Sequence, residues 1–219
     1  MRILGISSAT KIISIGLIEG EKVMVETTLA ELQAEKVIYY IKEAGIEPEG
    51  IEGVAVAVGP GSYSGLRGGL ATAKSLAQSL KVPLAGISTL EAIAYNLIDS
   101  EGTIAVILDA RLDEYNFALF GASGGKLKRL TGDLVLKLES LLTLLEKISG
   151  RILLAGNLTA VKEKIKKDNL CFSEEINSIP FGSNVAKLGL LKIEAGKSDD
   201  LLKLVPQYSH RPVFKEFSK

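Results

Sequence analysis

The clearest chemical signal in the sequence is a glycine-rich stretch, Gly59-Pro60-Gly61-Ser62-Tyr63-Ser64-Gly65-Leu66-Arg67-Gly68-Gly69. It lies between an apolar strand-like run and a long amphipathic segment, so we expect a loop that leads from a strand into a helix. Glycine permits close backbone approach, and backbone N–H groups at the start of a helix attract anions. The stretch therefore fits either an anion-binding loop or a tight turn.

Spacing excludes three familiar loop motifs. A Walker A loop needs a lysine, and this stretch has none. A dinucleotide-binding loop needs Gly-x-Gly-x-x-Gly. Counted from Gly59 and Gly61, this motif would place its third glycine at position 64, but the next glycine is Gly65. A nucleophile elbow needs glycines two residues before and two residues after its serine, and neither Ser62 nor Ser64 has both.

Two polar turns form the second candidate site. Asp109, Arg111 and Asp113 follow a strand-like run, and carboxylates at a strand end could hold Mg²⁺ with a nucleotide. The corresponding earlier turn, Ser7-Ser8-Ala9-Thr10, has hydroxyls but no acid, which disfavours ATP hydrolysis; a charged turn that caps a hairpin is the alternative. The residues expected to face an anion or nucleotide are Ser8, Thr10, Gly61, Ser62, Asp109 and Arg111.

The remaining reactive residue types give no catalytic or metal site. His210 is the only histidine, which excludes zinc sites built on paired histidines. Cys171 is the only cysteine, so no intrachain disulfide can form, and its apolar surroundings favour an inert thiol. Glu31 and Glu35 share a helix face but lack further ligands. The lysines of 162–167 fit a solvated helix face better than an RNA contact.

Composition bounds the class of protein. The 219 residues carry 26 basic and 26 acidic side chains, with a pI near 6.6, which disfavours an autonomous nucleic-acid binder. Hydrophobic residues make up 47% of the chain, so we expect a well-filled core. No apolar run reaches the roughly 18 residues of a membrane span. The sequence begins directly in a strand-like run without a signal peptide, and we expect the cytoplasm as its compartment.

The first hundred residues predict three antiparallel strands followed by alternating helices and strands. The expected strands are Ile3–Ile6, Ile12–Ile18, Val23–Thr27, Gly53–Val58 and Leu84–Ile87. The expected helices are Leu29–Ala44, Leu66–Leu80 and Thr89–Ile98. This order is βββαβαβ with a further helix.

After the polar break at residues 99–102 the pattern repeats. The expected strands are Thr103–Leu108, Glu114–Phe120, Lys126–Leu130, Ile152–Ala155 and Cys171–Ser173, and the expected helices are Glu139–Ile148, Ala160–Lys167 and Asn184–Ala195. Two βββαβαβ units in tandem predict an α/β protein with two actin-like, ribonuclease H-like lobes and a cleft between them. We expect residues 1–100 to form the first lobe and 101–219 a more divergent second lobe with a C-terminal tail.

The helix expected at Leu66–Leu80 has many small residues, which permit close approach of another helix. Both crossover helices of a βββαβαβ unit can lie on one side of its sheet. Leu29–Ala44 and Leu66–Leu80 could then present a two-helix surface that a second copy or a homologous partner completes as a four-helix bundle. The alternative is that the small residues only let the helix pack on its own sheet.

The glycine-rich stretch resembles the Gly-Pro-Gly-Ser-Tyr/Phe-Thr-Gly-Leu-Arg signature of the TsaB (YeaZ) family, which works in threonylcarbamoyladenosine modification of tRNA. Asp109-Ala110-Arg111 is similar to the family's Asp-Ala-Arg, and Glu35 falls where the family has the glutamate of its His-Ser-Glu run. Pro206-Gln207-Tyr208 is similar to the Pro-x-Tyr near the family's C-terminus. The resemblance covers most of the chain and implies a degenerate, TsaD-like member of the actin, sugar-kinase and heat-shock-chaperone fold.

Four positions depart from the family pattern and make the chain a divergent member. Ser7 stands where many relatives have aspartate, Gln33 where many have histidine, Tyr39 where they have proline, and Gly68 where they have isoleucine. The histidine pair with which TsaD binds metal is absent. The resemblance therefore implies a scaffold and not the transferase.

The resemblance also implies partners. It implies a noncatalytic subunit that pairs with the TsaD transferase, engages the ATP-dependent TsaE, and meets tRNA only through the complex; a homodimer through the same surface is the alternative pairing. No cofactor is expected on the isolated chain, and ATP with Mg²⁺ is expected only in the complex. The residues expected at the partner interface are Leu32, Glu35, Tyr39, Arg67, Leu70, Ala71 and Lys74.

Two rival functions stay open from the sequence. One is an ATP-using phosphotransferase of the same fold, which would bind ATP tightly as an isolated chain. The other is a peptidase of the same superfamily, which would need a nucleophile, and the sequence offers no constellation for one.

Overall fold

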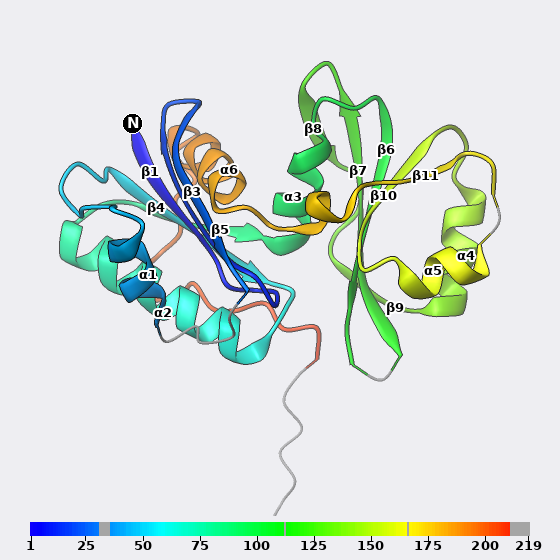
Figure 1. Cartoon of the computed structure of the whole chain (residues 1–219), viewed down its shortest axis with the longest axis horizontal. Helices are drawn as coiled ribbons and strands as arrows, with labels where there is room; N and C mark the ends of the chain where they lie inside the picture. The colour runs from blue at the N-terminus through cyan, green and yellow to red at the C-terminus, as the bar shows by residue number, and fades with distance from the viewer. Residues whose placement is uncertain (31–35, 112, 166, 211–219) are drawn as a thin grey trace, which may run out of the picture.

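Two mixed β-sheets, each built in a βββαβαβ-like order, form two lobes that lie side by side (Figure 1). The computed structural model describes residues 1–30, 36–111, 113–165 and 167–210. The first sheet has the strand order β3-β2-β1-β4-β5. The second has the order β11-β10-β6-β7-β8, and β9 also pairs with β7. This architecture confirms the predicted class of two tandem actin-like lobes.

The first sheet begins as three antiparallel strands and continues in parallel, because β1 pairs antiparallel with β2 and parallel with β4. Helical crossovers are what parallel neighbours require. The elements of this part of the chain are β1 (Arg2–Ser7), β2 (Ile13–Glu19), β3 (Lys22–Leu29), α1 (Val37–Glu43), β4 (Gly53–Gly59), α2 (Tyr63–Leu80) and β5 (Leu84–Ser88).

Helices cover both faces of the first sheet. Alternate residues of a strand point to opposite faces, so Leu4 and Ile6 pack toward α1 and α2, whereas Ile3 lies on the other face, toward α6 (Gly182–Glu194). Figure 1 shows α1 and α2 together on one side of the sheet and α6 on the other. The expectation that the two crossover helices share a face is confirmed.

The second sheet repeats this arrangement, and its strand β7 pairs with two short strands, β8 and β9. Its elements are β6 (Gly102–Asp109), β7 (Glu114–Ser123), β8 (Lys126–Arg129), β9 (Leu134–Lys137), α4 (Leu138–Lys147), β10 (Ile152–Gly156), α5 (Thr159–Lys164), β11 (Leu170–Phe172) and η3 (Glu175–Ser178). Helices α4 and α5 pack on one face, and α3 (Thr89–Ala94), which continues as η2 (Tyr95–Leu97), packs on the other.

Two helices pack on the sheet that the other half of the chain forms. Helix α3 comes before residue 100 but packs in the core of the second sheet, through Leu90 and Ile93. Helix α6 comes late in the chain but packs on the first sheet, through Val185 and Leu190. The division at residue 100 therefore separates the strands of the two sheets but not these two helices. Each lobe is completed by a helix from the other half of the sequence.

Helix α6 approaches the first sheet closely enough to touch its backbone. A Cβ on Gly5 would lie 2.0 Å from the carbonyl oxygen of Gly182, and one on Gly16 would lie 2.1 Å from the amide nitrogen of Ser183. Glu26 on β3 reaches the same helix end: its carboxylate accepts from the N–H groups of Gly182 (3.2 Å) and Ser183 (2.7 Å). The carboxylate thus serves as a remote N-cap.

The glycine-rich loop is shorter than predicted. Helix α2 begins at Tyr63, with Ser62 as its N-cap, so residues 63–69 form helical turns and only 59–62 form the loop. A Cβ on Gly61 would lie 2.2 Å from the carbonyl oxygen of Ala9, and one on Gly65 would lie 2.0 Å from that of Ser8. Two hydrogen bonds, Ser62 N–H to Ala9 O (2.7 Å) and Ser8 Oγ to Gly65 O (2.8 Å), hold this contact.

Three element predictions were wrong in detail. Leu29 belongs to β3, where it pairs with Ile13, and the described part of the first crossover helix begins only at Val37. Strand β9 was missed, although its residues alternate in burial as a half-buried strand should. Helix α5 ends at Lys164, and Lys167 lies beyond it and donates to carbonyls at the C-terminal end of α4 instead of lining a solvated helix face.

Replacing Glu26 by alanine is expected to lower the free energy of unfolding by about 1 kcal/mol, because the N–H of Ser183 loses its acceptor and the N–H of Gly182 keeps only the hydroxyl of Ser14, at 2.8 Å. Chemical denaturation followed by circular dichroism measures this change. Glu49→Ala is the control, since it removes an exposed acid for which the described residues provide no hydrogen bond or ion pair. Equal losses in the two variants would contradict the capping role.

Replacing Gly65 by alanine is expected to destabilise the fold by about 1–3 kcal/mol, as overpacking of a tight contact does. Alanine favours a helix over glycine by up to about 1 kcal/mol, but the clash with the carbonyl of Ser8 outweighs this gain. Gly132→Ala is the control, because a Cβ there meets no atom within 4 Å. A melting temperature of Gly65→Ala above that of the unchanged chain would show that the contact between Gly65 and Ser8 is not tight.

Candidate functional site

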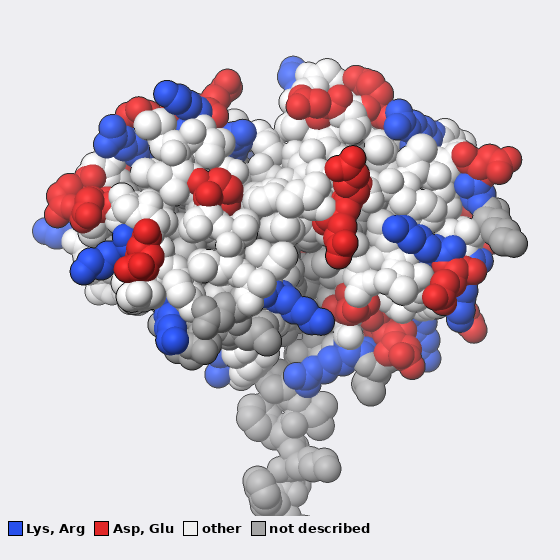
Figure 2. All heavy atoms as spheres, in the orientation of Figure 1, with Lys and Arg blue, Asp and Glu red and all other residues white. Residues whose placement is uncertain are grey.

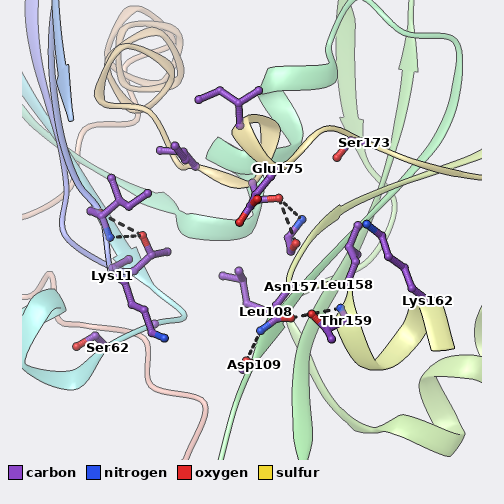
Figure 3. A pocket seen from close by; sticks show the side chains of 18 residues that line it. Lys11, Ser62, Leu108, Asp109, Asn157, Leu158, Thr159, Lys162, Ser173 and Glu175 are labelled. Atoms are coloured by element: carbon purple, nitrogen blue, oxygen red, sulfur yellow. Dashed lines mark hydrogen bonds between the residues drawn. The ribbon is translucent and has the colours of Figure 1, made fainter. Parts of the chain in front are cut away.

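A cleft of about 1070 Å³ lies between the lobes (Figure 3). Its walls come from the end of β6 and from the segments that follow β1, β4, β10 and β11, so the carboxyl ends of strands from both sheets face it. Open α/β sheets bind ligands outside these ends. Lining residues include Thr10, Lys11, Gly61 and Ser62 from the first lobe and Asp109, Asn157, Thr159, Lys162 and Glu175 from the second.

Both signs of charge line the cleft. Lys11 contributes a cation from the first lobe, and Lys162 contributes one from the second, where its ammonium lies 5.3 Å from the ring centre of Phe172. Asp109 and Glu175 add carboxylates. The carboxylate of Asp109 accepts a short hydrogen bond from the side-chain amide of Asn157, which fixes it on the wall of the second lobe.

The hydroxyls predicted to face an anion are largely engaged elsewhere. Ser8 is 2% exposed and donates to Gly65, so it secures the glycine loop and does not face the cleft. Thr10 bonds within its own turn, to the backbone of Ile12. Ser62 lines the cleft while it caps α2 through a 3.3 Å hydrogen bond from the N–H of Gly65.

Two further positions differ from the expected phosphate site. Arg111 is exposed and is not among the residues that line the cleft. Ser7 at the end of β1 is fully buried, and its hydroxyl finds no hydrogen-bond partner among the described residues. The cleft thus receives Gly61, Ser62, Thr10 and Asp109 of the predicted set. Lys11, Asn157, Lys162 and Glu175 were missed, because only folding brings their loops together.

The second candidate site is the outer surface of α1 and α2, which we call the docking face. Ile38 and Tyr39 on α1 are 51% and 54% exposed, which is high for large apolar side chains. On α2 the exposed positions Tyr63, Arg67, Ala71 and Ser75 recur every four residues and form one stripe. The sequence predicted Tyr39, Arg67 and Ala71 here but missed Ile38 and Tyr63.

The other four predicted interface residues are not exposed residues of the docking face that the structure describes. Leu70 is 4% exposed and belongs to the core under α2, so its side chain is not on the docking face. Lys74 is half-buried on the edge of the same helix. Leu32 and Glu35 lie outside the described residues, as does Gln33.

Arg67 is held by two tyrosines. Its guanidinium carbon lies 4.2 Å from the ring centre of Tyr63, and its Nε donates to the hydroxyl of Tyr208 at 2.9 Å. The hydrogen bond to Tyr208 raises the pKa of Arg67, so the side chain stays fully charged. The tail motif that contains Tyr208 was visible in the sequence, but its contact with α2 was not.

Metal binding and membrane insertion have no structural support in the described residues. Within residues 1–30, 36–111, 113–165 and 167–210, no three acidic, histidine or cysteine side chains gather as a metal site would need. The helices of these ranges are too short or too polar to cross a bilayer. Figure 2 shows basic and acidic side chains interspersed over both lobes, without a large patch of one sign on the visible face.

A family model matches most of the chain. Residues 33–191 match the model described as TsaD, tRNA N6-adenosine threonylcarbamoyltransferase. The matched range includes both docking helices, the glycine-rich loop and most of the second lobe. The chain is therefore homologous to that transferase over most of its length.

Two solved structures share the fold. YeaZ from Pseudomonas aeruginosa superposes with a TM-score of 0.77 at 19% identity, covering 94% of this chain and 99% of that one. A ROK family protein from Streptococcus pneumoniae superposes with a TM-score of 0.53 at 12% identity, covering 88% and 100%. At these identities the likeness concerns the fold alone, and both are consistent with two actin-like lobes.

A sequence relative extends over nearly the whole chain. The tRNA threonylcarbamoyladenosine biosynthesis protein TsaB of Bacillus subtilis is 30% identical over 218 residues, which cover 95% of this chain and 93% of that protein. The glycine-rich stretch and the two-lobed fold agree with this match. The chain belongs to the TsaB (YeaZ) family.

Proposed function

We propose that this protein is a noncatalytic scaffold subunit for threonylcarbamoyl transfer to N6 of adenosine 37, beside the anticodon of tRNAs that read ANN codons. In this proposal it forms a heterodimer with the TsaD transferase, engages the TsaE ATPase and acts in the cytoplasm. The observation that carries the proposal is the docking face, on a chain homologous to the transferase itself.

The docking face has the character of a helix–helix interface. Ile38 and Tyr39 expose large apolar surfaces on α1, and the stripe on α2 offers the small side chains of Ala71 and Ser75. Small residues let a second helix pair approach closely, and buried apolar and aromatic groups provide the binding energy. A homologous partner can present the equivalent two helices, so the four helices would form a bundle.

The charge distribution supports an indirect role in tRNA binding. Acidic and basic residues are equal in number and interspersed on the visible surface (Figure 2). Phosphate backbones are bound mainly by clusters of Lys and Arg. We therefore assign tRNA binding to the partner and not to this chain.

The cleft supports a scaffold better than an enzyme. The hydroxyl of Ser8 is committed to the glycine loop, and that of Thr10 to its own turn. The carboxylate of Asp109 is paired with Asn157. An activated nucleophile needs a base within hydrogen-bond reach, and neither hydroxyl has one among these contacts.

Replacing Ile38 by glutamate is expected to abolish co-elution with TsaD in size-exclusion chromatography and to reduce transfer activity of the mixture at least tenfold. A charge placed in a desolvated interface costs more than the contact it replaces. Because Ile38 is 51% exposed in the free chain, its folding stability should change little.

Leu130→Glu is the matched control, since Leu130 is 50% exposed on the second lobe. It should co-elute and support activity like the unchanged chain. If the unchanged chain fails to co-elute with TsaD, and TsaD transfers without it, the scaffold proposal is wrong. Co-elution of the chain only with itself would favour a homodimer on this face.

Calorimetric titration of the isolated chain with Mg²⁺ and ATP is expected to give no saturable binding. The first-lobe turn offers no carboxylate, and Ser7 at its start is buried. A repeat with the chain bound to TsaD reports a nucleotide held only by the complex. Saturable binding in the micromolar range by the isolated chain would instead favour the phosphotransferase.

A further inference from the structure

The last described segment, Asp199–His210, runs from the first lobe to the second, and we call it the strap. At its start it covers the open edge of β5: Asp199 pairs with Leu84, and its carboxylate accepts from the N–H of Gly86 at 2.7 Å. Further along, the N–H of Gln207 donates to the carbonyl of Val58, also at 2.7 Å. The strap is thus bound to two strands of the first sheet.

The end of the strap is bound to the second lobe. Ser209 Oγ donates to the side-chain oxygen of Asn116 at 2.6 Å, and His210 Nε2 lies 3.2 Å from Glu114 Oε2. Asn116 is 2% exposed and also donates to the carbonyl of Asp109, so this anchor lies on a buried part of β7. The strap is therefore held on both lobes.

Tyr208 lies between these anchors and against the docking face. Its ring stacks on Tyr63 with the centres 4.9 Å apart and an angle of 28° between the planes. Its hydroxyl accepts from Arg67 Nε. Tyr63 and Arg67 are the first two members of the exposed stripe on α2, and the guanidinium of Arg67 also lies over the ring of Tyr63. Tyr208 thus fixes one end of the stripe.

We infer that Tyr208 is a positioning residue for docking, and this rests on the proposed pairing with TsaD. An arginine on a helix surface otherwise samples many rotamers, and immobilising it upon binding costs affinity. Tyr208 orders the side chain before the partner arrives. The Nη groups of Arg67 have no hydrogen bond within the described residues, so they remain available to a carboxylate or carbonyl of the partner.

The inference extends to the second lobe. Because Ser209 anchors the strap to Asn116 of the second lobe, the order of Tyr208 and Arg67 depends on a residue of the lobe that does not carry α1 and α2. Loosening the anchor at Ser209 should weaken binding of a partner that touches only the first lobe.

The test is calorimetric titration of TsaD with the full-length chain and its variants. We expect about tenfold weaker binding for Tyr208→Ala, which loses the stack and the hydrogen bond, and about threefold for Tyr208→Phe, which loses only the hydroxyl. Ser209→Ala should fall between the unchanged chain and Tyr208→Ala. Lys203→Ala is the control on the same strap, because its side chain is 85% exposed, and it should bind normally.

A double-mutant cycle separates positioning from general stabilisation. If Tyr208 acts through Arg67, Tyr208→Phe should have no further effect in an Arg67→Ala chain. An unchanged threefold loss in that background would overturn the inference, as would normal affinity of Tyr208→Ala. Failure of the unchanged chain to bind TsaD would instead refute the proposed function, so the two failures are distinguishable.

Discussion

Backbone-to-backbone contact at glycines holds the first lobe together, and the rest of the molecule depends on it. Gly5 and Gly16 admit the start of α6 on one face of the first sheet. Gly61 and Gly65 admit the turn after β1 against the glycine loop and the start of α2. A side chain at any of these positions would separate elements that touch directly. The glycine-rich stretch accordingly allows close packing of the backbone, and the N–H of Ser62 donates to the carbonyl of Ala9 within the protein.

This packing determines what the two candidate sites present. Because α6 covers one face of the first sheet, α1 and α2 cover the other and expose their outer sides as the docking face. Because the loop after β4 is held against the turn after β1, both form one wall of the cleft. The strap then joins the docking face to the second lobe. A surface that is ordered before a partner binds loses less conformational entropy on binding.

Much of the fold followed from the sequence, because the repeat of three apolar strands before each helix is a local pattern. The packing of α3 on the second sheet and of α6 on the first was not predicted. The sheet on which a helix packs depends on contacts between residues far apart in the chain. The same holds for Glu26, whose partners Gly182 and Ser183 follow some 156 residues later. Of the residues expected at the partner interface, Tyr39, Arg67 and Ala71 are exposed on α1 and α2, whereas Leu70 shares the buried side of α2 with Leu66, Ala73 and Ala77.

Hydrogen exchange of the chain with and without TsaD tests the central claim most directly. Pairing through the docking face predicts slower exchange in residues 37–43 and 63–75, together with the strap around Tyr208, and unchanged exchange in α4 and α5. Protection confined to the second lobe, or no protection in α1 and α2 at saturating TsaD, would contradict it.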